Sequence, residues 1–379
     1  MYKEALRSAW AEINITNLDF NIKKIKEKVG PGKKITGIIK ADGYGHGSVR
    51  VATVLRANGI TSFGVATLNE AIRLREAGFV LEEILILGLT PDPYIDTIVK
   101  HRLTPVVCDY RNAEAISRAA AREGIIIKGF VAVDTGMGRI GYNPDDSASI
   151  EDIKMIASLS NFKIQGLFSH LANADSADKT FAAFQEQRYM VFYKKLLNAG
   201  VSIQCRTIAN SAAVMELSSC HYEMVRPGII LYGCYPSEEV DRNQLQLRPV
   251  MSVKANIIQL KKVPAGTSIS YGRKYITTKD SLIATIPLGY ADGFPRPYSM
   301  KGRVIVNGVM APVAGNICMD QCMIDVTHVP YVRMGDEVTI MGRDGIYEIL
   351  ADDIARATGT INYEIVCAFG QRLPKVYVY

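Results

Sequence analysis

Short apolar runs of strand length alternate with segments of helical period along residues 14–233. In the first helical segment, the apolar residues Leu18, Ile22, Ile25 and Val29 follow one another at intervals of four, three and four. These intervals place them on one face of a helix. We expect Thr16 to cap the start of this helix, and Gly30 marks its end.

The apolar runs predict eight parallel strands, which are Ile35–Ile39, Phe63–Ala66, Ile84–Leu87, Pro105–Val107, Ile125–Val133, Ile164–Ser169, Gln204–Ile208 and Gly228–Leu231. Helical segments such as Asn69–Ala77, Asn112–Glu123 and Lys179–Asn198 separate them. We interpret each strand as buried on both faces, as the strands of a parallel sheet are. The pattern predicts an α/β fold built on a (β/α)8 barrel of the TIM type, although an open doubly wound sheet also fits it.

After Tyr235 the pattern changes. A polar linker, Pro236–Asn243, leads into strands joined by tight turns, and Asn307-Gly308 is a typical two-residue hairpin turn. We expect a mostly antiparallel β domain with one short helix near Leu350–Ala357. The predicted organisation is an N-terminal strand in residues 1–13 associated with the β domain, a barrel in residues 14–240, and the β domain in residues 241–379.

Composition changes this picture little. The chain has 379 residues, of which 48% are hydrophobic and 22% charged, and its net charge of +6 is not gathered into a basic stripe. We therefore expect neither nucleic acid nor membrane as a partner. Seven scattered cysteines without a Cys-x-x-Cys pair favour reduced thiols in the cytoplasm, and we expect no metal site.

The candidate chemistry begins at Lys40, which ends the first predicted strand and precedes a glycine-rich loop. In a (β/α)8 barrel the carboxyl ends of the strands form the active-site face, so a reactive amine is well placed there. The glycines allow the backbone to approach a ligand closely. A surface lysine beside a flexible loop is the alternative interpretation.

The stretch Ile38-Ile-Lys40-Ala-Asp-Gly-Tyr44-Gly-His-Gly47 resembles the cofactor-binding motif of the alanine racemase family. Further matches follow in the family's order along essentially the whole chain. The resemblance implies that Lys40 forms the Schiff base with pyridoxal 5′-phosphate and that Tyr44 contacts the phosphate. It implies that Arg139, in Asp134-Thr-Gly-Met-Gly-Arg139, faces the substrate carboxylate.

The same resemblance assigns the rest of the cofactor site. It implies that His170 packs against the pyridine ring and that Arg226 faces the pyridine nitrogen. A permanently charged arginine there disfavours protonation of that nitrogen, which limits side reactions such as transamination. The remaining expected cofactor residues are Asn210, Ser211, Gly228 and Ile229 at the end of the barrel.

The second part of the chain contributes four residues by resemblance. Tyr271 is the second acid/base, Met319 binds the substrate carboxylate through its backbone amide, Tyr363 reaches the phosphate, and Tyr290 helps Tyr363 to narrow the entrance. Without the resemblance, each tyrosine is equally well explained as a packed side chain with a satisfied hydroxyl.

These roles predict an isomerase that interconverts L-alanine and D-alanine, supplying D-alanine for peptidoglycan. Removing a proton from one face of Cα and returning it on the other needs two bases on opposite sides of the external aldimine, and we assign Lys40 to the D-enantiomer and Tyr271 to the L-enantiomer. The resemblance implies that Tyr271 comes from the partner subunit of a homodimer. The alternatives are a racemase of serine or another amino acid, a non-catalytic pyridoxal-phosphate carrier, a decarboxylase of similar plan, and a sugar- or phosphate-binding barrel.

Three positions depart from the family pattern. Ala132 stands where a carbamylated lysine usually pairs with the loop arginine, which leaves Arg139 without that partner. Thr207 replaces a histidine that is often bonded to the arginine at the pyridine side, and Asn316 stands where arginine is expected. These departures bear on the choice of substrate rather than on the anchoring of the cofactor.

Overall fold

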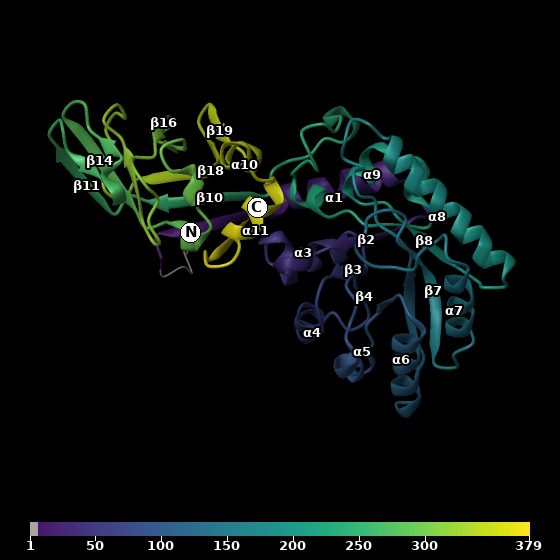
Figure 1. The fold of residues 1–379 in the computed structure, drawn as a ribbon. Helices are drawn as coiled ribbons and strands as arrows, with labels where there is room; N and C mark the ends of the chain where they lie inside the picture. The colour runs from purple at the N-terminus through teal and green to yellow at the C-terminus, as the bar shows by residue number, and fades with distance from the viewer. Residues whose placement is uncertain (1–6) are drawn as a thin grey trace.

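The computed structural model describes residues 7–379, in which a barrel and a β-rich part lie side by side (Figure 1). The barrel strands are β2 (Lys34–Ile38), β3 (Ser62–Val65), β4 (Glu83–Ile86), β5 (Val106–Val107), β6 (Ile127–Ala132), β7 (Phe162–Phe168), β8 (Cys205–Thr207) and β9 (Met224–Val225). They pair in parallel in the orders β4-β3-β2-β9 and β5-β6-β7-β8. A parallel bridge between Leu85 and Thr104 and the contact of β8 with β9 close the ring.

Helices surround this ring (Figure 1), and their buried residues are mostly apolar. They are α1 (Ile15–Val29), α3 (Ser48–Ala57), α4 (Leu68–Glu76), α5 (Ile95–Lys100), α6 (Tyr110–Arg122), α7 (Ser147–Ala157), α8 (Thr180–Asn198) and α9 (Ser211–Glu216). The predicted stripe of α1 is buried as expected. None of the helices in residues 7–379 has the combination of length and apolar composition that crossing a lipid bilayer requires.

Two predictions for the barrel are wrong in detail. The cap of α1 is Asn14 and not Thr16, because the Asn14 side chain accepts a hydrogen bond from the backbone N–H of Asn17. The eighth strand is β9, and the segment predicted as strand Gly228–Leu231 forms the short 3₁₀ helix η3 (Ile229–Tyr232). A short buried apolar run looks the same in a strand as in a turn of helix, so periodicity alone could not separate them.

The β-rich part is built around a seven-stranded sheet. Its strands are β1 (Ala9–Asn14), β10 (Met251–Asn256), β15 (Arg303–Val306), β16 (Val309–Pro312), β18 (Glu337–Asp344), β19 (Tyr347–Ile349) and β20 (Lys375–Val378). β1 lies between β10, to which it is antiparallel, and β20, to which it is parallel. The β15–β16 hairpin turns at Asn307 and Gly308, both with positive φ, as the sequence predicts.

A smaller sheet consists of β11 (Gln259–Val263), β14 (Ser281–Ile286) and β17 (Cys322–Asp325), with the hairpin β12 (Ser268–Ile269) and β13 (Tyr275–Ile276) packed on it. Figure 1 shows β11 and β14 at the end of the molecule farthest from the barrel. The C-terminal helices are α10 (Ala351–Thr358), near the position expected, and α11 (Asn362–Phe369). The prediction of one short helix was therefore wrong, because α11 is short and largely apolar and shows no clear helical pattern.

Candidate functional site

Lys40 follows β2 and begins α2 (Lys40–Tyr44), a turn of unusual backbone conformation. Ala41, Asp42, Gly43 and Tyr44 have φ values of 51°, 52°, 65° and 52°, which makes this a left-handed turn. Such a conformation costs about 1–2 kcal/mol for each residue with a side chain. Strain of this kind persists only where the surroundings enforce it, and it is common at functional sites.

Contacts from three directions hold the turn. Asp42 accepts hydrogen bonds from the backbone and side chain of Ser48 and pairs with Lys375 of β20 at 3.0 Å. His46, which is buried, donates from Nδ1 to the carbonyl oxygens of Gly43 and Tyr44, at 3.0 and 2.9 Å. On the third side Gly45 meets Gly370 at the end of α11, where a β-carbon on Gly370 would lie 2.1 Å from the Gly45 Cα.

The environment of Lys40 favours the neutral amine. Burial lowers the pKa of Lys40 below its ordinary value, and the positive charge of Arg139 lowers it further. Glu70 and Cys367 act in the opposite direction. The neutral amine, and not the ammonium ion, is the form that acts as a nucleophile and as a base.

Arg226 lies on the same side of the barrel, fully enclosed and without a carboxylate. It donates to the hydroxyl of Thr207, to the carbonyl oxygen of Ser169 at 2.5 Å and to Nδ1 of His170 at 3.4 Å. Its guanidinium also lies 4.2 Å from the centre of the Phe168 ring. Burial lowers the pKa of Arg226 to about 9, so it remains a cation at neutral pH.

His170 stays neutral in this setting. Burial lowers its pKa to about 3, and the charges of Arg226, Arg139 and Lys40 contribute to the shift. Because Nδ1 accepts from Arg226, the ring proton of the neutral imidazole belongs on Nε2. Arg139 lines the same small cavity as His170, and it forms no ion pair within residues 7–379. Ala132, which is buried, offers it none.

A third group of residues lies where the segment after β9 meets α2. Gly228 donates its N–H to the Ser211 hydroxyl at 2.9 Å, and a β-carbon on Gly228 would lie 2.8 Å from the Tyr44 hydroxyl oxygen. The Tyr44 ring lies 6.1 Å from that of Tyr363 on α11. Burial raises the pKa of both phenols, so each remains a hydrogen-bond donor. Asn210 caps α9 beside Ser211, and Ile229 follows Gly228 in η3.

The remaining predicted residues gather elsewhere. Tyr271, on the β12–β13 hairpin, is 68% exposed, Met319 is 53% exposed and Tyr290 is 41% exposed. They form one surface, since Tyr271 and Met319 line a common pocket and the Tyr290 N–H donates to the Cys318 carbonyl oxygen at 2.9 Å. Asn316 donates to the Tyr271 carbonyl oxygen at 2.7 Å. The hairpin that carries Tyr271 packs on the sheet whose strands β11 and β14 lie farthest from the barrel (Figure 1). The turn that begins at Tyr290 instead packs on α11, where a β-carbon on Gly293 would lie 2.4 Å from Ala368.

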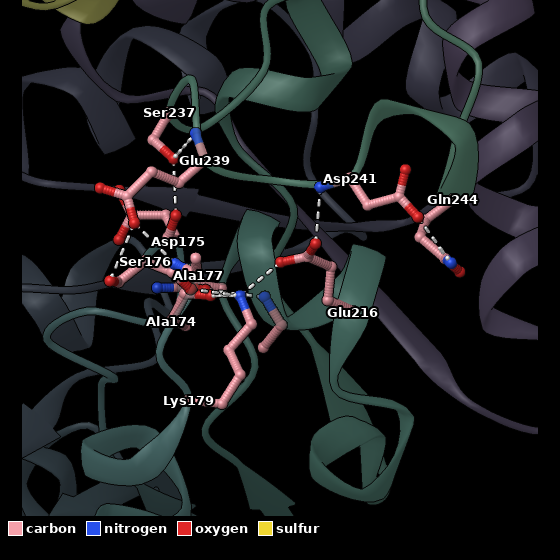
Figure 2. A network of polar contacts seen from close by, with 12 residues as sticks. Ala174, Asp175, Ser176, Ala177, Lys179, Glu216, Ser237, Glu239, Asp241 and Gln244 are labelled. Carbon is pink, nitrogen blue, oxygen red and sulfur yellow. Dashed lines mark hydrogen bonds and ion pairs between the residues drawn. The ribbon is translucent and has the colours of Figure 1, made fainter.

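The segment that follows His170 is tied to the linker between the two parts of the chain, as Figure 2 shows. Lys179 donates to the carbonyl oxygens of Ala174 and Ser176 and to the Glu216 carboxylate, at 2.8, 2.7 and 2.5 Å. Glu239 accepts from the hydroxyl of Ser176 at 3.1 Å, and Glu216 also accepts from the Asp241 N–H at 2.7 Å. These contacts fix the loop beside His170.

Sequence reasoning missed Glu70 and Cys367, the two groups that raise the pKa of Lys40. Glu70 had a detectable signal, because Thr67-Leu-Asn-Glu70 is a capping box at the start of α4. Cys367 lies four residues after Tyr363 and so on the same face of α11, but this requires knowing that the segment is helical.

The fold and the lysine-centred site define an enzyme with a (β/α)8 barrel and a following β-rich part. The sequence matches the family descriptions "Alanine racemase, N-terminal domain" over residues 13–236 and "Alanine racemase, C-terminal domain" over residues 250–377. The chain belongs to the alanine racemase family, as the sequence analysis indicated.

Individual relatives agree with this assignment. An alanine racemase of Clostridium kluyveri is 48% identical over 98% of this chain and 94% of its own length. The solved structure of the alanine racemase of Clostridium difficile superposes with a TM-score of 0.94 at 40% identity, covering 99% of this chain and 97% of that one. A histidine racemase of Leuconostoc mesenteroides has a TM-score of 0.90 at 28% identity, with both chains covered completely.

Alanine racemases use pyridoxal 5′-phosphate, and the residues present here fit that group. An aldehyde needs an amine that can be neutral, and Lys40 is one. A phosphate needs hydrogen-bond donors, and the hydroxyls of Tyr44 and Ser211 both lie next to Gly228, which has no side chain to keep a ligand away from them. A basic ring nitrogen needs a donor, and the buried guanidinium of Arg226 has only neutral partners within residues 7–379.

Proposed function

We propose that this enzyme interconverts L-alanine and D-alanine with pyridoxal 5′-phosphate bound at Lys40. The observation that carries the proposal is the amine of Lys40, which burial and Arg139 shift toward its neutral form at the mouth of the barrel. Membership of the alanine racemase family and relatives of up to 48% identity support alanine as the substrate.

The cofactor would be held by residues of this chain. Lys40 forms the covalent link, and Tyr44, Ser211, Gly228, Ile229 and Tyr363 surround the phosphate. His170 packs against the ring and Arg226 donates to the ring nitrogen, while Asn210 positions Ser211 by capping α9. When bound, pyridoxal phosphate withdraws electrons from the amino acid and so makes its Cα–H bond acidic.

Two groups move the proton. In the conversion of L-alanine to D-alanine, Tyr271 removes the Cα proton on one face and Lys40 donates a proton on the other. In the reverse direction Lys40 removes the proton and Tyr271 donates one. Arg139 and the Met319 amide hold the carboxylate, and Tyr290 with Tyr363 narrows the entrance. Tyr271 is exposed on a hairpin that packs on the sheet at the end of the molecule farthest from the barrel (Figure 1), so we propose a homodimer in which each site receives Tyr271 from the partner subunit.

We further propose that the barrel domain spans residues 14–240 and the β domain residues 241–379, with the first strand joined to the latter. Residues 1–6 of that first segment, predicted at 1–13, lie outside the described residues. The free thiols of all seven cysteines support a place in the cytoplasm, where the product would enter peptidoglycan.

A different amino acid is the second candidate. A histidine racemase shares the whole fold, so the architecture accepts larger substrates. The departures at Ala132, Thr207 and Asn316 alter contacts around Arg139, Arg226 and Tyr271, which bear on the substrate carboxylate and the second base. Serine or a larger amino acid therefore remains the alternative substrate.

The test is exchange of the α-proton in heavy water. The purified enzyme, supplied with pyridoxal phosphate, is offered a panel of L- and D-amino acids, and we expect alanine to gain deuterium and lose optical rotation fastest. Tyr271→Phe should abolish racemisation but still allow exchange from D-alanine, because Lys40 remains. Lack of α-deuterium in every amino acid would overturn the proposal, as would a native rate in Tyr271→Phe.

A further inference from the structure

Glu70 makes the contact that best explains why the turn after Lys40 keeps its left-handed form. Its Oε1 accepts the N–H of Ala41 at 2.6 Å, and its Oε2 accepts the N–H of Ala66 at 2.7 Å and that of Thr67 at 3.2 Å. One carboxylate therefore joins the residue after Lys40 to the end of β3 and the start of α4.

The charge of Glu70 is also available to Lys40. The other carboxylate on this turn, Asp42, is engaged by Lys375 at 3.0 Å and by Arg73 at 3.2 Å. Glu70 forms no ion pair within residues 7–379, and its hydrogen bonds are to backbone N–H groups. Its charge raises the pKa of Lys40, against the larger lowering by burial and by Arg139.

We propose that Glu70 is a positioning residue with two roles. It fixes the backbone directly after Lys40. It also places beside the Lys40 amine a carboxylate that forms no ion pair with any cation in residues 7–379. The inference rests on the proposed function in taking Lys40 as the reacting amine. It goes beyond that function because it assigns the position and the charge environment of the Lys40 amine to Glu70, a residue outside the proposed cofactor and substrate sites.

Two variants separate the effect of the charge of Glu70 from that of the length of its side chain. Glu70→Gln removes the charge and keeps the length of the side chain. Glu70→Asp keeps the charge, but it is one methylene shorter and cannot span Ala41 and Ala66 together. Thr67→Ala is the matched control, because it removes the hydroxyl that caps α4 at 3.4 Å and leaves the Ala41 contact in place.

The first readout uses the apoprotein, with acetic anhydride as the amine reagent and quantification of the Lys40 peptide by mass spectrometry. We expect the pH of half-modification to fall in Glu70→Gln relative to the wild type, because an anion that stabilises the ammonium is lost. It should stay near the wild-type value in Glu70→Asp and in Thr67→Ala. An unchanged midpoint in a folded Glu70→Gln protein would overturn the role of the charge.

The second readout uses the holoenzyme. Both Glu70 variants should lower kcat by roughly tenfold to 10²-fold, because the amine is misplaced, while Thr67→Ala stays close to the wild type. Equal losses in Thr67→Ala and the Glu70 variants would reduce Glu70 to a helix cap and overturn the proposal. The anhydride measurement involves no racemisation. A wild type that fails to racemise would therefore refute the proposed function, whereas an unchanged pH of half-modification in Glu70→Gln would refute the role of Glu70.

Discussion

Arg226 is a buried cation that the fold surrounds with neutral groups. Its partners in the described chain are a hydroxyl, a carbonyl oxygen and an imidazole nitrogen. A buried charge without a counter-charge is costly, and it is retained where it serves a ligand. Thr207 explains one departure from the family pattern, since its hydroxyl accepts from Arg226 at the place where a histidine is usual. The Thr207 hydroxyl thus gives the Arg226 guanidinium a neutral acceptor.

The proposed phosphate site can be tested by adding a single carbon atom, the β-carbon of Gly228→Ala. A β-carbon there would lie 2.8 Å from the Tyr44 hydroxyl oxygen, and the Tyr44 ring is confined by Tyr232 at 5.0 Å. We expect Gly228→Ala to weaken the binding of pyridoxal phosphate by about tenfold or more, in keeping with the cost of about 1–3 kcal/mol for overpacking. Titration of the apoprotein, followed by absorbance, measures this.

The control for Gly228→Ala is Tyr44→Phe, which removes the oxygen that the new methyl group would strike. If the proposed crowding is the cause, the double variant should lose less affinity than the sum of the two single losses. Strict additivity of the two losses would contradict this explanation.

At the scale of elements, long periodic helices were predictable and the short irregular ones were not. The predicted helix Lys179–Asn198 agrees with α8 (Thr180–Asn198) to within one residue, because several turns carry its apolar face. By contrast, nothing in Ala41, Asp42 and Tyr44 suggests a left-handed turn, since residues with a side chain avoid it. Contacts with Glu70, His46 and α11 hold the turn in this conformation. Contacts between segments that are distant in the sequence cannot be predicted from a local sequence pattern.

The same distinction applies to the site. Lys40, Tyr44 and His170 could be named because their motifs are continuous in the sequence. The capping box marks Glu70 only as a residue at the start of a helix, and Cys367 has no such signal. Their approach to Lys40 could not be predicted, because it depends on the packing of α4 and α11 against α2. The separation of Tyr271 from Lys40 within one chain likewise depends on the arrangement of the two parts.

His46 provides a prediction for the left-handed turn. Burial lowers its pKa to about 4 from 6.5, despite the hydrogen bonds from Nδ1 to Gly43 and Tyr44. Between pH 6.5 and 4 the unfolded chain binds the proton and the folded chain does not, so stability falls as pH falls through this window. The loss should approach about 1.4 kcal/mol per pH unit for this group.

The matched variant is His46→Asn, whose side-chain amide can still donate to these carbonyl oxygens but does not titrate. We expect the free energy of unfolding of the wild type to decline more steeply than that of the variant between pH 6.5 and 4, measured by urea denaturation of the holoenzyme. Parallel declines in the two proteins would show that His46 does not titrate in this way.

On the scale of the whole molecule, the residues of the proposed site fall into two separate groups in each chain. The barrel carries Lys40, Arg139 and Arg226, while Tyr271 and Met319 lie exposed in the β-rich part, where they line a common pocket. A two-fold symmetric dimer can place the second surface of each chain over the first surface of the other, which completes two sites at once.

Subunit mixing tests this arrangement directly. Lys40→Ala and Tyr271→Phe dimers should each fail to racemise alanine, because each lacks one base in both sites. After the two are unfolded together and refolded, random pairing makes half of the dimers mixed, and each mixed dimer holds one intact site. Activity should therefore return to about a quarter of the wild-type value per subunit if the sites are shared. If each site were built from a single chain, the mixed dimer would contain only defective sites. The mixed dimer can be isolated when the two subunits carry different affinity tags. If the isolated mixed dimer is inactive, the shared site is ruled out.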